Sequence, residues 1–473
     1  MRMPLTPVVD DHGALPVEEL ARLNAGFTAS DAALQAWALP EAPLLQAMPV
    51  HTPGSAAAHY QRALQGLAQQ PERPLALSVR LPFCAARCLC CERVVHVAQP
   101  TAVLDAYVSA LVDEIDAVAQ AVGGGRDMLQ VHLGGGTANE LNESQLARLV
   151  TGLQRHWRLP ADAEATADCD PRRVGEFQLR LLRGLGFRRL NFGVLDLDAD
   201  VQRAIGRQQS VALVDDVCDL ARQCGIDYVN LELMLGLPHQ TAASWQLTLQ
   251  RVLAMGPDRL RVSRYRHRPL LAPAQRALDR HAMPTPQECD ALSELTVQVL
   301  CGAGYRWIGA EQFVLENDEL AQAFDAARLR RSLIAYTATE STALLGFGVG
   351  AVGDIDGALF WNEPALSDWC LALHGGRLPV ARARLSDQHE QRRRAAVEQL
   401  LCRHELPAAQ AQGGLESAYQ GLARRAADGL VQVQADRIVL TPRGRHALHL
   451  LCGEFGTAPD AAAVQPGVLP WNC

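Results

Sequence analysis

A repeated alternation of short apolar segments and longer amphipathic segments most constrains the fold of this chain. Between residues 75 and 309, apolar runs of strand length alternate with segments in which apolar residues have helical spacing. Consecutive β–α units pair their strands in parallel through right-handed crossovers. We therefore predict an α/β protein with a full or partial β/α barrel. The predicted strands are 75–81, 129–133, 164–169, 189–194, 228–235, 259–263 and 305–309, and the predicted helices are 102–122, 143–156, 174–184, 211–225, 245–255 and 287–303.

The segments on either side of this alternation differ from it. Residues 1–70 are rich in Ala, Leu and Pro, and four prolines between 40 and 53 break any long helix, which predicts an extension over a domain or a flexible arm. After about residue 385, two helices (391–402 and 415–428), a β-hairpin (429–440) and a closing helix (443–451) resemble a winged-helix module. The predicted parts are an N-terminal extension (1–70), a β/α barrel (71–370), a winged-helix-like α+β domain (385–455) and a tail (456–473).

Composition narrows the class of protein. The 473 residues carry 44 basic and 52 acidic side chains, a net charge of -8, which argues against a dedicated nucleic-acid binder. No apolar run is long enough to span a membrane, and the first residues lack the apolar core of a signal peptide. We expect a cytoplasmic monomer.

Four of the 13 cysteines lie in one short stretch directly after the first predicted strand. Cys84, Cys88 and Cys91 form a C-x3-C-x2-C pattern, with Cys90 beside them. Clustered thiols in a reducing compartment are more often metal ligands or redox groups than disulfides. Three thiolates can hold three irons of a [4Fe–4S] cube and leave the fourth iron open, an arrangement that resembles radical S-adenosyl-L-methionine (SAM) enzymes. A zinc site with Cys90 as fourth ligand, a Cys88–Cys91 redox pair and buried thiols are the alternatives.

A glycine-rich segment follows the second predicted strand at the same end of the barrel. Gly134-Gly135-Gly136-Thr137 allows the backbone to approach a ligand closely, and without a following Gly-Lys-Ser/Thr it is no P-loop. Active sites of such folds lie at the carboxyl ends of the strands. Beside the cysteines, the segment is interpreted as the glycine motif that binds the SAM amino group. A tight strand–helix connection is the alternative.

Basic side chains follow the sixth predicted strand. Arginine pairs bidentately with carboxylates, so this group predicts a site for an anionic substrate, with a solvated basic rim as the alternative. Its members are Arg261, Arg264, Arg266, His267 and Arg268. His96 and His132 could bind haem iron, but single histidines are more often structural.

The chain as a whole, from about residue 70 to 455, resembles the oxygen-independent coproporphyrinogen III oxidases (coproporphyrinogen dehydrogenases) of the radical SAM superfamily. The matching pieces are 81–84, 132–137, 170–172, 192–194, 236–238, 257–260, 345–349 and 442–445. The resemblance implies a partial (β/α) barrel, a [4Fe–4S] cluster, SAM, a tetrapyrrole substrate and an electron donor such as flavodoxin or ferredoxin. It implies oxidative decarboxylation of two propionates of coproporphyrinogen III to vinyls, giving protoporphyrinogen IX, through a 5′-deoxyadenosyl radical.

The resemblance also implies roles for individual residues. Cluster ligands are expected at Cys84, Cys88 and Cys91, cofactor contacts at Gly135, Gly136, Thr137, Asp168, Arg207, Glu232 and Cys90, and substrate contacts at Arg261, Arg264, Arg266 and Arg268.

The sequence departs from the family pattern at several strand ends. Where the family has a tyrosine, a histidine, a fourth cysteine and a glutamine, this chain has Ser78, Arg80, Arg93 and Leu195. Its Asp168 and Glu232 replace a glutamate and an aspartate, Cys90 replaces an aromatic residue, and 44–49 and 311–313 also differ. These changes leave open a haem- or porphyrin-binding or delivery protein that lost the oxidase activity. A regulator that binds DNA through the C-terminal module and Arg392–Arg394 is a third, less favoured reading.

Overall fold

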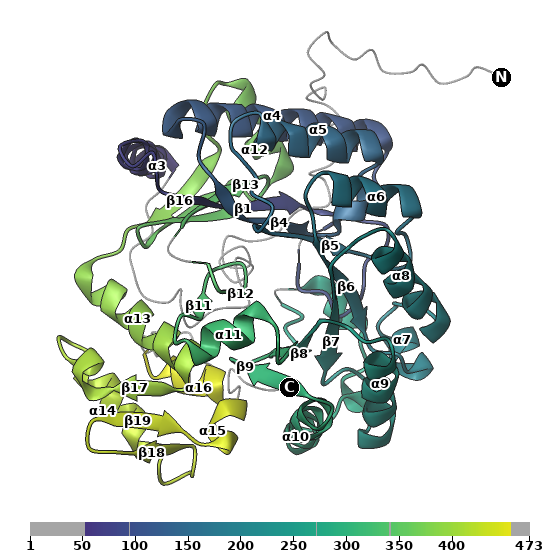
Figure 1. Ribbon diagram of the computed structural model, residues 1–473, viewed down its shortest axis with the longest axis vertical. Coiled ribbons are helices and arrows are strands. Elements are labelled where there is room, and N and C mark those ends of the chain that lie inside the picture. Colours follow the sequence, from purple (N-terminus) through teal and green to yellow (C-terminus); the bar gives the residue numbers. More distant parts are fainter. Residues whose placement is uncertain (1–52, 94, 271, 340–341, 456–473) are drawn as a thin grey trace.

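One curved sheet organises the molecule. The computed structural model describes residues 53–455 except positions 94, 271, 340 and 341, so the predicted tail, residues 1–52 of the extension and the 44–49 segment lie outside the described residues. The sheet has 12 strands in the order β16-β15-β14-β13-β1-β4-β5-β6-β7-β8-β10-β9. Figure 1 shows it bending around a central space with helices outside it. The predicted α/β fold and partial barrel are confirmed.

Seven neighbouring strands of this sheet run parallel. They are β13 (Ala343–Phe347), β1 (Leu75–Leu81), β4 (Met128–Gly135), β5 (Glu164–Cys169), β6 (Arg189–Leu195), β7 (Tyr228–Leu235) and β8 (Arg259–Arg264). The outer helices are α4 (Thr101–Val122), α5 (Glu143–Gln154), α6 (Glu176–Gly184), α8 (Val211–Gln223), α9 (Ala242–Ala254) and α10 (Pro286–Gly302). Capping boxes at Asn142, Thr241 and Thr285 start α5, α9 and α10 by satisfying backbone N–H groups. The six predicted helices and the first six predicted strands are all present.

The seventh predicted strand does not continue the parallel series, which corrects that prediction. β9 (Tyr305–Ile308) pairs antiparallel with β10 (Gln312–Leu315), and β10 pairs antiparallel with β8. Only three residues separate β9 from β10, too few for a crossover, so the two strands form a hairpin at the sheet edge.

The other edge of the sheet was not predicted. β13 joins β1 in parallel, and β14 (Val352–Ile355), β15 (Ala358–Asn362) and β16 (Val380–Arg384) extend the sheet antiparallel. Helix α12 (Leu366–His374) connects the last two strands. β1 is therefore an interior strand, flanked by β13 and β4.

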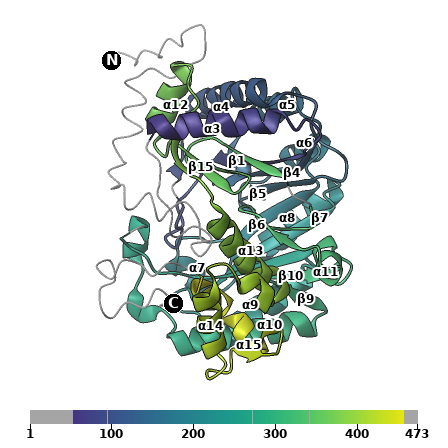
Figure 2. The same ribbon diagram turned by 90° about the vertical axis from the view of Figure 1, so that its left-hand side faces the viewer.

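Part of the predicted N-terminal extension is a regular helix. α3 (Pro53–Ala68) starts at a proline, which fits the first turn because that position needs no N–H donor. It buries Tyr60, Leu64 and Leu67 in the barrel core and contacts α4 and β16. Figure 2 shows α3 at one end of the molecule and the C-terminal helices at the other. The other three prolines that were expected to break a long helix, at 40, 43 and 49, lie outside the described residues.

The C-terminal region contains the predicted hairpin. β18 (Val431–Val433) and β19 (Arg437–Leu440) pair antiparallel, and β17 (Glu405–Pro407) adds a third strand that was not predicted. The helices are α13 (Gln388–Arg403), α14 (Glu416–Arg424), α15 (Pro442–His446) and α16 (Leu448–Gly453), so the closing helix is split in two. Their core includes Ile308, Val314 and Leu320 from β9, β10 and α11 (Glu319–Asp325). The four domain boundaries stay a prediction.

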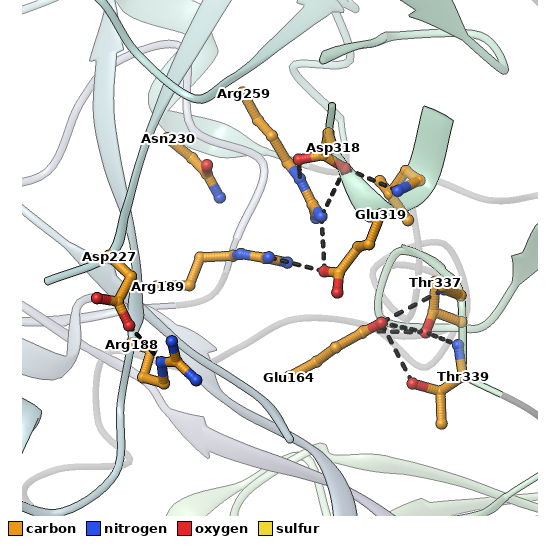
Figure 3. Close-up of polar contacts among 12 residues, drawn as sticks. Glu164, Arg188, Arg189, Asp227, Asn230, Arg259, Asp318, Glu319, Thr337 and Thr339 are labelled. Carbon is orange, nitrogen blue, oxygen red and sulfur yellow. Dashed lines mark hydrogen bonds and ion pairs between the residues drawn. The ribbon is translucent and has the colours of Figure 1, made fainter. Parts of the chain in front are cut away.

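Buried ion pairs cross the amino ends of the barrel strands (Figure 3). Arg259 of β8 contacts Asp318 at 2.7 and 2.9 Å, and Glu319 bridges Arg259 at 2.8 Å and Arg189 of β6 at 2.7 Å. Glu164 of β5 accepts hydrogen bonds from Thr337 of β12 (Tyr336–Thr337) at 2.8 Å. Breaking the fully buried Arg259–Asp318 pair would cost about 3–5 kcal/mol, whereas Glu319 is 40% exposed and its two pairs contribute less. These contacts fasten α11 and β12 to the barrel.

The helices were compared with the length and apolar character of a membrane span. Across the described part of the chain, no helix combines the length and the apolar character needed to cross a bilayer.

Candidate active site

A single cavity of about 470 Å³ holds all the residues that the sequence assigned to cluster, cofactor or substrate. It lies within the barrel, from the cysteine loop at the carboxyl ends of the strands down to Glu164, Arg189 and Arg259 at their amino ends. The parallel strand order explains the convergence, because the carboxyl ends of neighbouring strands meet on one side of the sheet. The structure therefore brings together motifs that are far apart in the sequence.

The cysteine loop leaves β1 and is held by short backbone contacts. Cys84 ends β2 (Phe83–Cys84), which pairs with β3 (His96–Val97), and the N–H of Cys91 donates to the carbonyl of Cys88 at 3.1 Å. Burial, together with the nearby thiols of Cys91 and Cys88, raises the pKa of Cys84 to about 12. Burial also raises the pKa of Cys91. Three thiols placed this close together fit a site where bound iron cations stabilise thiolates.

Cys90 has different surroundings from its neighbours. It is 2% exposed and packs with Val201, Ile205, Leu237 and Tyr265. Over the described residues, no three His, Cys, Asp or Glu side chains form a group that could hold a single metal ion. This arrangement differs from the four ligands around one ion that a zinc site needs.

The glycine segment is pinned to the cysteine loop. The N–H of Gly136 donates to the carbonyl of Leu81 at 2.8 Å, and the N–H of Thr137 donates to that of Phe83 at 3.0 Å. Gly135 has φ +96°, in the region that favours glycine. β4 runs on through Gly135, so the prediction that this strand stops before Gly134 was wrong. The segment forms a cradle beside Cys84 that side chains would fill.

Substitution of Gly136 tests this cradle. A Cβ there would lie 2.6 Å from the carbonyl oxygen of Leu81, and a backbone oxygen cannot move aside cheaply. We expect Gly136→Ala to weaken SAM binding by more than about 10-fold, because the shifted loop loses its aligned hydrogen bonds. Equilibrium dialysis of reconstituted protein would measure this. Gly66→Ala is the control, since nothing lies within 4 Å of that Cβ and binding should not change; equal losses in both variants would contradict the role of the cradle.

Asp168 is a fully engaged carboxylate at the end of β5. Its Oδ1 accepts from Asn191 at 2.9 Å and contacts His132 Nε2 at 3.1 Å, while Oδ2 lies 3.4 Å from Arg93 Nη1. Burial acts to raise the pKa of Asp168, but His132, Arg93 and Asn191 together hold that pKa below its usual range. His132 is thus a partner of Asp168, which agrees with its structural reading.

Arg207 connects the cysteine loop to the strand ends. Its Nη1 donates to Cys88 Sγ at 3.4 Å, and its Nη2 lies 3.3 Å from Asp170 and donates to the carbonyl of Gly193. Its Nε is buried without a partner among the described residues. Arg207 therefore ties a proposed cluster ligand to the ends of β5 and β6.

The four arginines in and after the sixth predicted strand, here called the rim, line the cavity, and most of them have acidic partners. Arg261 lies 2.8 Å from Glu311 and 3.7 Å from Glu232, and Arg264 lies 2.9 Å from Asp290. Arg266 lies 3.5 Å from Glu92. Arg261 helps to hold the pKa of Glu311 at about 2 although burial opposes this.

Other cavity residues were missed or noted only as departures. They are Arg80, Arg93, Asn191, Arg189, Arg259 and the apolar hairpin tip Leu333–Ala335. The strand period of two was a usable signal, since Arg189, Asn191 and Gly193 alternate along β6 and all line the cavity.

Comparison with known proteins agrees with this fold and site. The fold and the site are those of a radical SAM protein, and the model of the radical SAM superfamily matches residues 78–252. The oxygen-independent coproporphyrinogen III oxidase of Escherichia coli (strain K12) is 35% identical over 84% of this chain and 88% of its own length. That of Pseudomonas aeruginosa is 33% identical over 81% and 85%. This chain belongs to the oxygen-independent coproporphyrinogen III oxidase family.

A solved structure supports the same assignment. Coproporphyrinogen III oxidase (HemN) from Escherichia coli, a radical SAM enzyme, superposes with a TM-score of 0.79 at 34% identity, covering 84% of this chain and 93% of that one. The superposed part of the chain is much longer than residues 78–252, the range that the radical SAM model matches.

Proposed function

We propose that this chain is a radical SAM oxidoreductase that decarboxylates two propionates of coproporphyrinogen III to vinyls, giving protoporphyrinogen IX without oxygen. The observation that carries the proposal is one cavity that combines the three cysteines, the glycine cradle and a strongly basic lining. Family membership supports the reaction, since the relatives above bear the name of this oxidase.

The charge of the cavity supports an anionic substrate. Nine arginines line it against four carboxylates, although the whole chain has a net charge of -8. Clefts lined by one sign of charge concentrate ligands of the opposite sign, and guanidinium groups pair well with carboxylates. A tetrapyrrole that carries several propionates has the required chemistry. Rim residues Arg261, Arg264, Arg266 and Arg268 are proposed as contacts for its outer propionates.

The protein side of the cofactor sites follows from the same geometry. Cys84, Cys88 and Cys91 are the proposed cluster ligands, and Gly135 with Gly136 would offer backbone carbonyls to the SAM amino group. When bound, the [4Fe–4S] cluster and SAM supply the 5′-deoxyadenosyl radical that removes a substrate hydrogen.

Five further residues have proposed supporting roles. Arg207 donates to Cys88 and fixes its loop, and Asp168 and Glu232 would contact SAM at the strand ends, beside Thr137 and Cys90.

Two expectations about partners remain proposals. A flavodoxin or ferredoxin would supply the electron, and the protein would act as a cytoplasmic monomer. The names of the relatives favour the enzyme over the alternative of a porphyrin-binding or delivery protein that lost the oxidase activity.

A direct assay tests the proposed function. Protein purified without oxygen and reconstituted with iron and sulfide would receive SAM, dithionite and coproporphyrinogen III. We expect 5′-deoxyadenosine to form while coproporphyrinogen III loses two carboxyl groups in steps. Mass spectrometry would detect both products. A loaded cluster that never cleaves SAM would contradict the enzyme and favour porphyrin binding.

A further inference from the structure

Charge pairing separates the arginines of the cavity into two kinds. Arg261, Arg264 and Arg266 at the rim each lie within 4 Å of a carboxylate. Arg80, by contrast, makes no side-chain hydrogen bond and no ion pair with any residue in the part of the chain that the structure describes. An arginine stays charged in proteins, so Arg80 is a cation in the cavity without a counterion among the described residues.

Arg80 lies at the end of the cavity that contains the cysteine loop, beside the cradle. It is on β1 opposite Gly134 of β4, and its side chain lies against Gly135, where a Cβ would be 2.6 Å from Arg80 Cγ. Burial and the neighbouring cation of Arg93 lower the pKa of Arg80, whereas the nearby Cys91 acts in the opposite direction. Arg80 therefore lies close to both Arg93 and a proposed cluster ligand.

Arg93 adds a second cation at the same place. Its backbone N–H donates to Cys91 Sγ at 3.3 Å, and its guanidinium lies 3.4 Å from Asp168. Asp168 is also engaged by His132 and Asn191, so Arg93 shares this carboxylate with two other side chains. Burying a charge without a partner is costly, so this site is completed when a ligand supplies an anion.

We propose that Arg80, supported by Arg93, binds the carboxylate of one substrate propionate at the end of the cavity that contains the cysteine loop. This inference rests on the proposed function and names the part of the site that receives the arm nearest to the cluster ligands. Both the tetrapyrrole and SAM carry carboxylates. The substrate is favoured because its several propionates match a cavity with nine arginines and four carboxylates. Arg268, which also has no ion pair in the described part of the chain, would receive a second arm at the rim.

Binding measurements on the reconstituted holoenzyme test this assignment. Coproporphyrin III, the stable oxidised form of the substrate, would be titrated by its absorbance, and SAM by equilibrium dialysis. We expect Arg80→Gln to raise the Kd of coproporphyrin III by about 10- to 100-fold, the size of a lost hydrogen bond to a charged group. Arg80→Lys should restore part of the affinity, because it keeps the charge and loses the bidentate geometry.

Iron content and SAM affinity distinguish propionate binding by Arg80 from two other roles, binding of the SAM carboxylate and neutralisation of the cysteine thiolates. Both should stay at the wild-type level in Arg80→Gln. Arg148→Gln is the matched control: it removes one positive charge from α5, outside the cavity, and should change no measured value. A weaker SAM affinity with unchanged porphyrin affinity would overturn the proposal and assign Arg80 to the SAM carboxylate. Loss of iron would overturn it too, because Arg80 would then be a counterion of the thiolates.

The titration also distinguishes failure of the inference from failure of the proposed function. If the wild-type protein cleaves no SAM but binds coproporphyrin III in an Arg80-dependent way, the function is wrong and the carboxylate site stands. If decarboxylation proceeds and Arg80→Gln binds coproporphyrin III normally, the function stands and the carboxylate site is wrong.

Discussion

Cys88→Ser should leave the protein unable to form 5′-deoxyadenosine, with a fall of more than about 100-fold. Changes to the surroundings of metal ligands already cost 10- to 100-fold in affinity or activity, and Cys88 is proposed as a ligand itself. Its thiol receives a hydrogen bond from Arg207 and lies beside Cys84 and Cys91 in the cavity. Serine cannot replace a thiolate on iron at neutral pH. Iron and sulfide content, cluster absorbance and deoxyadenosine yield after anaerobic reconstitution would measure the loss.

Cys90→Ser is the matched control on the same loop. Cys90 packs in an apolar cluster, and its carbonyl accepts a hydrogen bond from Gln275 at 3.2 Å that the substitution leaves in place. A buried hydroxyl without a partner costs about 1–3 kcal/mol, so this variant should unfold more easily and still bind iron. If Cys90→Ser lost iron and Cys88→Ser kept it, the proposed ligand set would be wrong, and Cys90 would take the place of Cys88 in it.

The predictable part of the fold was the part whose pattern is local. From β4 to β8 each strand is followed by its own helix, so periodicity over short windows found the elements and their order. β13 pairs with β1 although the two strands lie far apart in the sequence. β14 and β15 form a meander without crossover helices. No local signal marks such pairing, because register is set by which distant segment covers an exposed strand edge. For the same reason, Tyr305–Ile308 was identified as a strand but placed in the wrong direction.

The site shows a similar division. Cysteine spacing and the glycine run are local motifs, and both lie in the cavity. The charge state of the cavity depends on partners from separate segments, such as Glu311 and Asp290 for the rim arginines. Arg80 stood out in the sequence only as a departure from the family. Its lack of a carboxylate partner became visible once all nearby strand ends were placed.

Glu114 should make the stability of the protein strongly dependent on pH. This side chain of α4 is 1% exposed and accepts hydrogen bonds from the Gly348 N–H at 2.8 Å, Asn362 at 2.6 Å and Trp369 at 3.2 Å. These donors favour the carboxylate, but burial has the larger effect and raises the pKa of Glu114 to about 7. A carboxyl group with a raised pKa folds best when protonated. Its contribution to stability is therefore complete below about pH 4.5 and is lost as the pH rises through about 7.

Glu114→Gln removes this titration and separates the two effects. Between pH 5 and 8, the wild-type free energy of unfolding should fall by up to about 3 kcal/mol more than that of the variant, since each unit of pKa shift corresponds to about 1.4 kcal/mol. At pH 5 the variant should be less stable by about 1–3 kcal/mol, because the amide presents an N–H where partners also donate. Urea unfolding at both pH values would measure this, with the exposed Asp216→Asn as control. Parallel pH profiles for wild type and Glu114→Gln would show that the three donors keep Glu114 ionised, and that the junction of α4, β13 and β15 tolerates a buried charge.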